Sequence, residues 1–209
     1  IRRPPRSTPS NSSAASDVYK RQKNMSIKAV LFDADGTLYN HRFGAPPVVY
    51  HNLLLKEFER LKESYGMETA KRYVEEYTLK ELMLDPDLLY TLDKLKKKNL
   101  LLFIISDHDQ DCLESIVRSF GIEEFFDEIV TSSKVGGVKR LLKGFEYILE
   151  KYSLKSSEAI RVGDSVKRDI LPAVAVGIKP LFVVRAHNRC EMKKYYTNIH
   201  SLVEIIKYI

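Results

Sequence analysis

The chain has 209 residues, 44% of them hydrophobic and 30% charged, a composition typical of a globular protein with one sizeable core. No apolar run approaches the roughly 18 residues that a membrane-spanning helix needs, so we expect no membrane partner. The formal net charge is +6, but residues 1–22 contribute +4 of it. The remaining +2 gives no reason to expect a nucleic-acid partner. Cys112 and Cys190 lie far apart in the sequence, which argues against a disulfide framework or a zinc site and favours a reducing cytoplasm.

Residues 1–22 are rich in Pro and Ser and have no apolar periodicity, so we predict that they are disordered. Their letters resemble translated sequencing adapters: IRRPPRST matches one adapter, and SSAASDVYKRQ matches the adapter that normally follows it. We therefore expect a sequencing scar, assign it no part in fold or function, and place the natural start at Met25. A genuine basic tail and a truncation upstream of Met25 are the open alternatives.

Short apolar runs alternate with amphipathic segments along most of the remaining chain. This alternation predicts an α/β fold, a Rossmann-like, doubly wound parallel sheet covered by helices on both faces. We place this core domain at residues 23–39 and 85–209. A helix is expected to start with Asp85 as its N-cap and Pro86 as its first residue, and to run to Lys98. The expected strands are 27–32, 100–105, 128–131, 159–162 and 180–184.

Residues 40–84 interrupt the alternation and form the second predicted unit. Two helical patterns, at 48–65 and 68–84, are separated by Gly66, and no strand is expected between them. A helical segment inserted after the first strand predicts a small cap over the strand ends, where parallel sheets of this kind place their sites.

The clearest chemical motif is Asp33-Ala-Asp35-Gly36-Thr-Leu, directly after the first strand. Gly36 permits the turn that lets both carboxylates face one reacting group. One carboxylate can attack a phosphate, and the other can protonate the leaving oxygen and then activate water. A calcium loop is the alternative, but position 12 counted from Asp33 is Gly44 where such a loop needs Glu. A turn of merely solvated acids also stays open.

Two further strands end in polar residues. Ser106-Asp107 follows the second strand, where a serine can donate a hydrogen bond to a phosphoryl oxygen or simply cap the next helix. Asp164 follows the strand at 159–162 and offers a carboxylate to a hard cation such as Mg²⁺, or a helix cap. Asp169 lies five residues further on and can support that ligand. The acidic and His residues at 107, 108, 109 and 111 are interpreted as helix-start residues.

Together these motifs resemble the haloacid-dehalogenase superfamily, over residues 27–206. The resemblance implies that Asp33 is the nucleophile and Asp35 the general acid/base, and that Ser106, with Asp107 beside it, binds the phosphoryl group. It implies Mg²⁺ held by Asp33, Asp164 and the Asp35 carbonyl, with Asp169 in support. The family's motif-three lysine is assigned to Lys139 because of its spacing to the next helix, although Arg140 stands where a proline usually follows. Lys134 is the alternative.

The resemblance further implies a phosphatase of the C1-capped branch that acts on a small phosphorylated metabolite, such as a sugar phosphate or nucleotide. Asp35 favours phosphate-ester cleavage, because the family's dehalogenases and phosphonatases lack this second acid. A phosphosugar mutase and a catalytically silent binding relative are the rival hypotheses. The sequence indicates neither the physiological substrate nor the oligomeric state.

Overall fold

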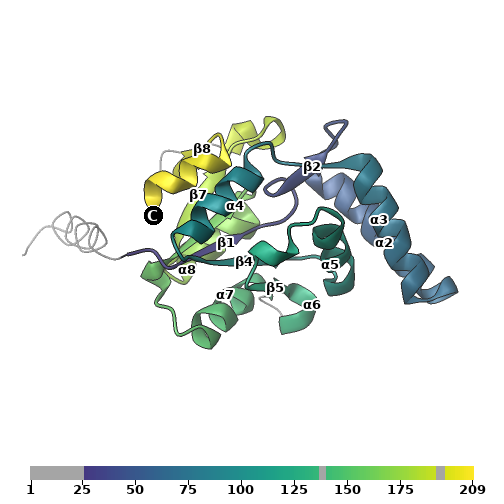
Figure 1. The fold of residues 1–209 in the computed structure, drawn as a ribbon, viewed down its shortest axis with the longest axis horizontal. Helices are drawn as coiled ribbons and strands as arrows, with labels where there is room; N and C mark the ends of the chain where they lie inside the picture. Colours follow the sequence, from purple (N-terminus) through teal and green to yellow (C-terminus); the bar gives the residue numbers. More distant parts are fainter. Residues whose placement is uncertain (1–25, 137–139, 192–195) are drawn as a thin grey trace, which may run out of the picture.

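The computed structural model describes residues 26–136, 140–191 and 196–209 (Figure 1). The expectations for residues 1–22, for the start at Met25 and for Lys139 lie outside these ranges. Among the described residues, no helix is both long and apolar enough to cross a membrane. The cytoplasmic location stays a prediction, as do the domain boundaries.

Six parallel strands form one sheet in the order β5-β4-β1-β6-β7-β8. The doubly wound α/β prediction is therefore confirmed, with β1 in the middle of the sheet. β8 was not expected, because a three-residue edge strand carries no readable apolar run. The strands are β1 (Ala29–Phe32), β4 (Leu101–Ser106), β5 (Glu128–Thr131), β6 (Ala159–Gly163), β7 (Lys179–Val183) and β8 (Thr197–Ile199).

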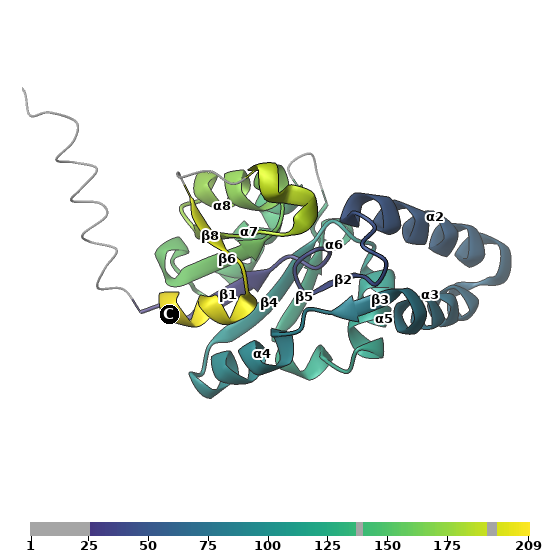
Figure 2. The ribbon, with the colours of Figure 1, turned by 90° about the horizontal axis from the view of Figure 1, so that it is seen from above.

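Successive side chains of the strands enter two cores, one on each face of the sheet. Val30 and Phe32 of β1 pack on the face covered by α4 (Leu88–Lys97) and α5 (Gln110–Ser119). Ala29 and Leu31 pack on the face covered by α7 (Arg140–Lys151) and α8 (Leu171–Ala175). Figure 2 shows α7 and α8 on one side of the sheet and α4 and α5 on the other. The short helical turns are η2 (Glu123–Phe125), α6 (Ser132–Val135), η3 (Ser156–Glu158), η4 (Val166–Ile170), η5 (Ala186–Glu191) and η6 (Leu202–Tyr208).

The insertion after β1 contains the two expected helices, α2 (Pro47–Tyr65) and α3 (Met67–Glu81), which meet at Gly66. Both helices lie beyond one end of the sheet (Figure 2). The expectation of no strand here is wrong, because β2 (Tyr39–His41) and β3 (Leu82–Leu84) pair antiparallel where the chain enters and leaves the insertion. Strands of three residues are too short to show a periodic pattern in the sequence. Their pairing also depends on contacts between residues more than 40 positions apart.

The predicted start of the helix at 85–98 is also wrong. The N-cap is Asp87, and α4 begins at Leu88. Asp85 instead accepts a hydrogen bond from the Asp87 amide at 3.1 Å, and its other oxygen lies 2.5 Å from Nη2 of Arg185. The Asp85 side chain thus keeps a capping-type bond to the amide two residues on and also makes a long-range ion pair, which local sequence does not indicate.

Glu128, at the start of β5, holds a cluster of side chains from α6 and α7. Its carboxylate accepts hydrogen bonds from Lys134 at 2.9 Å, from Lys151 at 2.8 Å and from Tyr147 at 2.9 Å. Burial raises the pKa of Glu128, but the hydrogen bonds from Lys151, Lys134 and Tyr147 outweigh it and lower the pKa to about 2. The ionised form is therefore favoured in the folded state.

We predict that in Glu128→Gln the free energy of unfolding depends less on pH in the acid range than it does in the wild type. Because the folded-state pKa is depressed, the stabilisation is present above the ordinary value of 4.5 and is lost as the pH falls towards 2. Both lysines are partly exposed, so solvent weakens their interaction with Glu128. The substitution should therefore lower the free energy of unfolding at neutral pH by about 1 kcal/mol, less than the pKa shift of Glu128 alone would imply. Urea unfolding from pH 7 to pH 2.5 measures it, with the exposed Glu124→Gln as control. Parallel pH profiles for Glu128→Gln and wild type would contradict the prediction.

Candidate active site

The predicted site residues meet at the carboxyl end of the sheet. Asp33 follows β1, Ser106 ends β4 and Asp164 follows β6, and β1 lies between the other two strands in register. The Asp33 amide donates a hydrogen bond to the Val162 carbonyl at 2.8 Å, which continues the β1–β6 ladder up to the site. All three side chains are buried. The parallel arrangement thus brings together side chains that are far apart in the sequence.

A tight turn follows Asp33 and brings the chain against Asp164. Gly36 has a φ of +77°, and its amide donates a hydrogen bond to the Tyr39 carbonyl at 2.9 Å. A Cβ at Gly36 would overlap the Asp164 carboxylate. Both the backbone conformation and the close approach therefore require glycine at this position.

Three carboxylates converge beside this turn. Ligand oxygens of Asp33, Asp164 and Asp169 lie within 4.8 Å of one another, and all three side chains are buried. Burial and the charge of Asp169 raise the pKa of Asp33 well above its ordinary value, although Arg161 opposes them. Burial also raises the pKa of Asp164, against a hydrogen bond from His187. In the described part of the chain, Oδ1 of Asp164 has no hydrogen-bond partner. This group of hard oxygen ligands fits a divalent cation such as Mg²⁺.

Arg161 supplies buried positive charge to the same cluster. Its side chain is fully buried, with Nη2 2.5 Å from Oδ1 of Asp169 and 3.4 Å from Oδ1 of Asp33. The guanidinium carbon lies 5.3 Å from the centre of the Phe145 ring. Arg161 was not among the predicted site residues, although an arginine inside the otherwise apolar run of β6 was a visible signal.

Asp169 is held at both of its oxygens. Oδ2 accepts a hydrogen bond from the Ser165 amide at 2.9 Å, while Oδ1 faces Arg161. A Cβ on Gly163 would overlap the Asp169 side chain, so the strand end and η4 are in close contact here. These contacts fix the loop that carries Asp164 and agree with the supporting role expected for Asp169, which remains a prediction.

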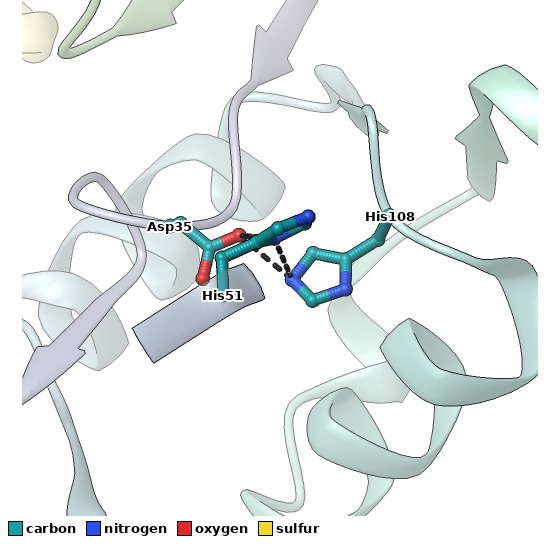
Figure 3. A group of neighbouring side chains, drawn as sticks. All are labelled: Asp35, His51 and His108. Carbon is teal, nitrogen blue, oxygen red and sulfur yellow. Dashed lines mark hydrogen bonds and ion pairs between the residues drawn. The ribbon is translucent and has the colours of Figure 1, made fainter. Parts of the chain in front are cut away.

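Asp35 faces two histidines rather than the other carboxylates (Figure 3). Its Oδ2 lies 2.7 Å from Nε2 of His108 and 3.0 Å from Nδ1 of His51. Burial alone would raise the pKa of Asp35, but His108 and His51 outweigh it and lower the pKa below its ordinary value. The sequence interpretation missed His51, and its assignment of His108 to the helix start is wrong. Asp109 does cap α5, but His108 turns inward and is 1% exposed.

The remaining predicted phosphate-binding residues lie on the β4 and β5 side. Oγ of Ser106 accepts a hydrogen bond from the His108 amide at 3.5 Å. The carbonyl of Asp107 accepts one from Ser132 at 3.3 Å. Lys134 pairs with Glu128 at the start of β5, and Lys139 lies outside the described residues. The choice of the motif-three lysine therefore stays a prediction.

A pocket of about 260 Å³ opens beside Asp164, between the core and the start of α2. Nε2 of His187 lies 2.6 Å from Oδ2 of Asp164, and Nδ2 of Asn188 donates to the Asp164 carbonyl at 2.7 Å. Neither residue belongs to a motif that the sequence analysis recognised. The pocket is lined by Pro46, Pro47, Val48, Asp164, Ser165, Arg168, His187 and Asn188.

We predict that Gly36→Ala is much more destabilising than Gly44→Ala. Both glycines have positive φ, +77° and +72°, but only Gly36 is close to other atoms. The shared conformational cost is about 1–2 kcal/mol, and overpacking against Asp164 should add about 1–3 kcal/mol for Gly36→Ala alone. Urea unfolding of both variants tests this. Equal losses would show that Gly36 does not approach Asp164 in solution.

We also predict that Arg161→Met destabilises the protein by about 3–5 kcal/mol, because it leaves buried carboxylates without their cation. The control is Lys97→Met, which breaks an exposed ion pair with Asp93 and should cost less than about 1 kcal/mol. Both are compared by urea unfolding without divalent ions. A loss for Arg161→Met as small as the control's would contradict the buried ion cluster.

Comparison with known proteins shows which family the chain belongs to. The model for haloacid dehalogenase-like hydrolases matches residues 50–183. The glyceraldehyde 3-phosphate phosphatase of Methanocaldococcus jannaschii is 34% identical over 128 residues, which cover 58% of this chain and 56% of that protein. The phosphoglycolate phosphatase of Pasteurella multocida is 26% identical over 133 residues, which cover 64% of this chain and 57% of that protein. The chain thus matches a little over half the length of these two curated relatives.

Solved structures share the whole fold. A HAD phosphatase from Thermococcus onnurineus superposes with a TM-score of 0.66 at 23% identity, covering 87% of this chain and 97% of that one. The hydrolase YfnB from Bacillus subtilis, bound to magnesium, gives a TM-score of 0.63 at 17% identity, covering 88% of this chain and 99% of that one. At these identities the likeness shows the fold alone. Since the family match spans more than half of the sequence, the chain belongs to the haloacid dehalogenase-like hydrolases.

Proposed function

We propose that the protein is a Mg²⁺-dependent phosphatase that hydrolyses a small phosphorylated metabolite through an aspartyl-phosphate on Asp33. The observation that carries this proposal is the convergence of buried Asp33 and Asp164 at the end of the sheet, beside a pocket. Buried acids without a full set of cations are costly, so their presence together indicates a bound cation and a charged reactant.

Asp33, Asp164 and the carbonyl of Asp35 are the proposed Mg²⁺ ligands. The partnerless Oδ1 of Asp164 and the raised pKa values of Asp33 and Asp164, caused mainly by burial, support a cation at this place. Bound Mg²⁺ would neutralise the carboxylates and the phosphoryl oxygens, so that two anions can approach each other. Arg161, whose Nη2 lies 3.4 Å from Oδ1 of Asp33, reduces the same repulsion.

In the proposed mechanism Asp33 attacks the phosphorus and the substrate's alkoxide leaves with a proton from Asp35. Water then attacks the aspartyl-phosphate after giving its proton to Asp35, and phosphate is released. The contacts of Asp35 with His51 and His108 favour its ionised form, which suits the second step. Ser106, with Asp107 beside it, and Lys139 are the proposed phosphoryl-binding groups.

The pocket and the relatives support a small substrate. The pocket beside Asp164, of about 260 Å³, has room for a small phosphorylated compound. Arg168 lines this pocket and can pair with an anionic group. The relatives named above are phosphatases of glyceraldehyde 3-phosphate and of phosphoglycolate, both small phosphorylated compounds.

We expect Mg²⁺-dependent phosphate release from at least one member of a panel of phosphorylated metabolites. Asp33→Asn should lower kcat/KM by about 10³-fold or more, equal to about 4 kcal/mol, because it removes the nucleophile. The matched control is Asp93→Asn, an exposed acid on α4 that should leave activity unchanged. Release is measured with and without Mg²⁺ for all three proteins.

Three results would contradict the proposal. Phosphate release from no member of the panel would favour the catalytically silent relative. Undiminished release in Asp33→Asn would exclude the assigned nucleophile. Interconversion of phosphorylated sugars in the presence of a bis-phosphorylated sugar, without phosphate release, would favour the mutase.

A further inference from the structure

A second group of metal-ligating atoms lies beside the proposed Mg²⁺ ligands. Oδ2 of Asp35, Nδ1 of His51 and Nε2 of His108 point toward one another (Figure 3). Oδ2 lies 3.0 Å from the His51 nitrogen and 2.7 Å from the His108 nitrogen, and the two nitrogens are 3.0 Å apart. Each residue comes from a different segment: the turn after β1, the cap helix α2 and the turn after β4.

Hydrogen bonding alone cannot satisfy this triangle while Asp35 is ionised. If both facing nitrogens are protonated, both can donate to Oδ2 of Asp35, but two N–H groups then face each other at 3.0 Å. If only one is protonated, the lone pair of the other faces the ionised carboxylate. With Asp35 ionised, one of the three short contacts is therefore repulsive in every protonation state of the two histidines, whereas a cation between the three atoms makes all of them favourable.

Two buried atoms without hydrogen-bond partners also support a metal site here. Within the described residues, Oδ1 of Asp35 and Nδ1 of His108 are buried and have no hydrogen-bond partner. The polar contacts of the His108 ring among the described residues are therefore made by Nε2, which faces Asp35, His51 and, at 3.3 Å, the hydroxyl of Tyr39. The free Oδ1 of Asp35 leaves that carboxylate able to bind an ion through either or both of its oxygens.

We infer that the side chains of Asp35, His51 and His108 form a binding site for a transition-metal cation of the Zn²⁺ class, next to the proposed Mg²⁺ site, to which Asp35 contributes only its carbonyl. Two imidazoles with one carboxylate form a ligand set that suits Zn²⁺, because Zn²⁺ binds imidazole nitrogen well whereas Mg²⁺ prefers oxygen ligands. Bonds of about 2.0–2.1 Å in tetrahedral geometry separate the ligand atoms by about 3.3 Å. The observed separations of 2.7–3.0 Å reach that arrangement by small outward shifts. Three protein ligands leave a fourth position for water or a substrate oxygen.

An ion at this site connects the two parts of the molecule. His51 lies on α2 of the insertion, whereas Asp35 and His108 lie at the end of the sheet, so the ion ties the cap to the core. It also takes up the carboxylate of Asp35. We therefore expect Zn²⁺ to inhibit phosphate release, a consequence that rests on the proposed function, whereas the binding itself does not.

The experiment measures Zn²⁺ binding to the full chain by calorimetry in excess Mg²⁺, which keeps the carboxylate site occupied. We expect one equivalent of Zn²⁺ to bind to the wild type and to Asp164→Asn, in which Asp35, His51 and His108 are all intact. His51→Gln and His108→Gln should each weaken binding by about 100-fold or more through loss of a ligand. His200→Gln, which replaces an exposed histidine, is the control and should bind as the wild type does.

Unchanged affinity in both His51→Gln and His108→Gln would overturn the inference, as would loss of Zn²⁺ binding in Asp164→Asn alone. The absorption spectrum of the Co²⁺-loaded wild type gives a test that needs no variant to fold. Intense visible bands of a four- or five-coordinate ion support the site, and the weak bands of an octahedral ion overturn it. Because these readouts are binding and absorption, they test the metal site even if the protein shows no phosphatase activity.

Discussion

The site depends on burying several like charges at the end of the central strand. Ligand oxygens of Asp33, Asp164 and Asp169 lie within 4.8 Å of one another, and all three side chains are buried. Such a group is unstable unless cations offset it, and Arg161 offsets part of the charge from inside the sheet. In the proposed mechanism the uncompensated remainder draws a divalent cation and, with it, a phosphoryl group into the active site.

The loops around this charge cluster are held by contacts that serve several segments at once. The Arg185 guanidinium donates to the carbonyls of Gly36 and Thr37 and pairs with Asp85. One side chain after β7 thereby joins the turn that follows the nucleophile to the segment where the chain leaves the insertion. The close approach of Gly36 to Asp164 sets the same turn from the other side. The position of Asp33 is thus tied to both ends of the cap.

Asp35 links the chemistry to the cap more directly. Its carboxylate contacts His51 on α2 and His108 after β4, so the protonation and ligation of this acid depend on where the insertion lies. In the proposed mechanism Asp35 must exchange protons with substrate and water. In the inferred metal site the same carboxylate is a ligand. His51 lies on α2, so both arrangements include a residue of the insertion.

The parallel α/β core, the helical insertion and the meeting of Asp33, Ser106 and Asp164 could all be predicted from the sequence, because strand periodicity is local and parallel strands end at one edge. The β2–β3 pairing, the inward turn of His108 and the arrival of His51 from the cap came only from the tertiary structure. These features depend on contacts between residues tens of positions apart, for which local sequence carries no signal. Helix-start chemistry explained His108 equally well until the fold showed which groups it faces.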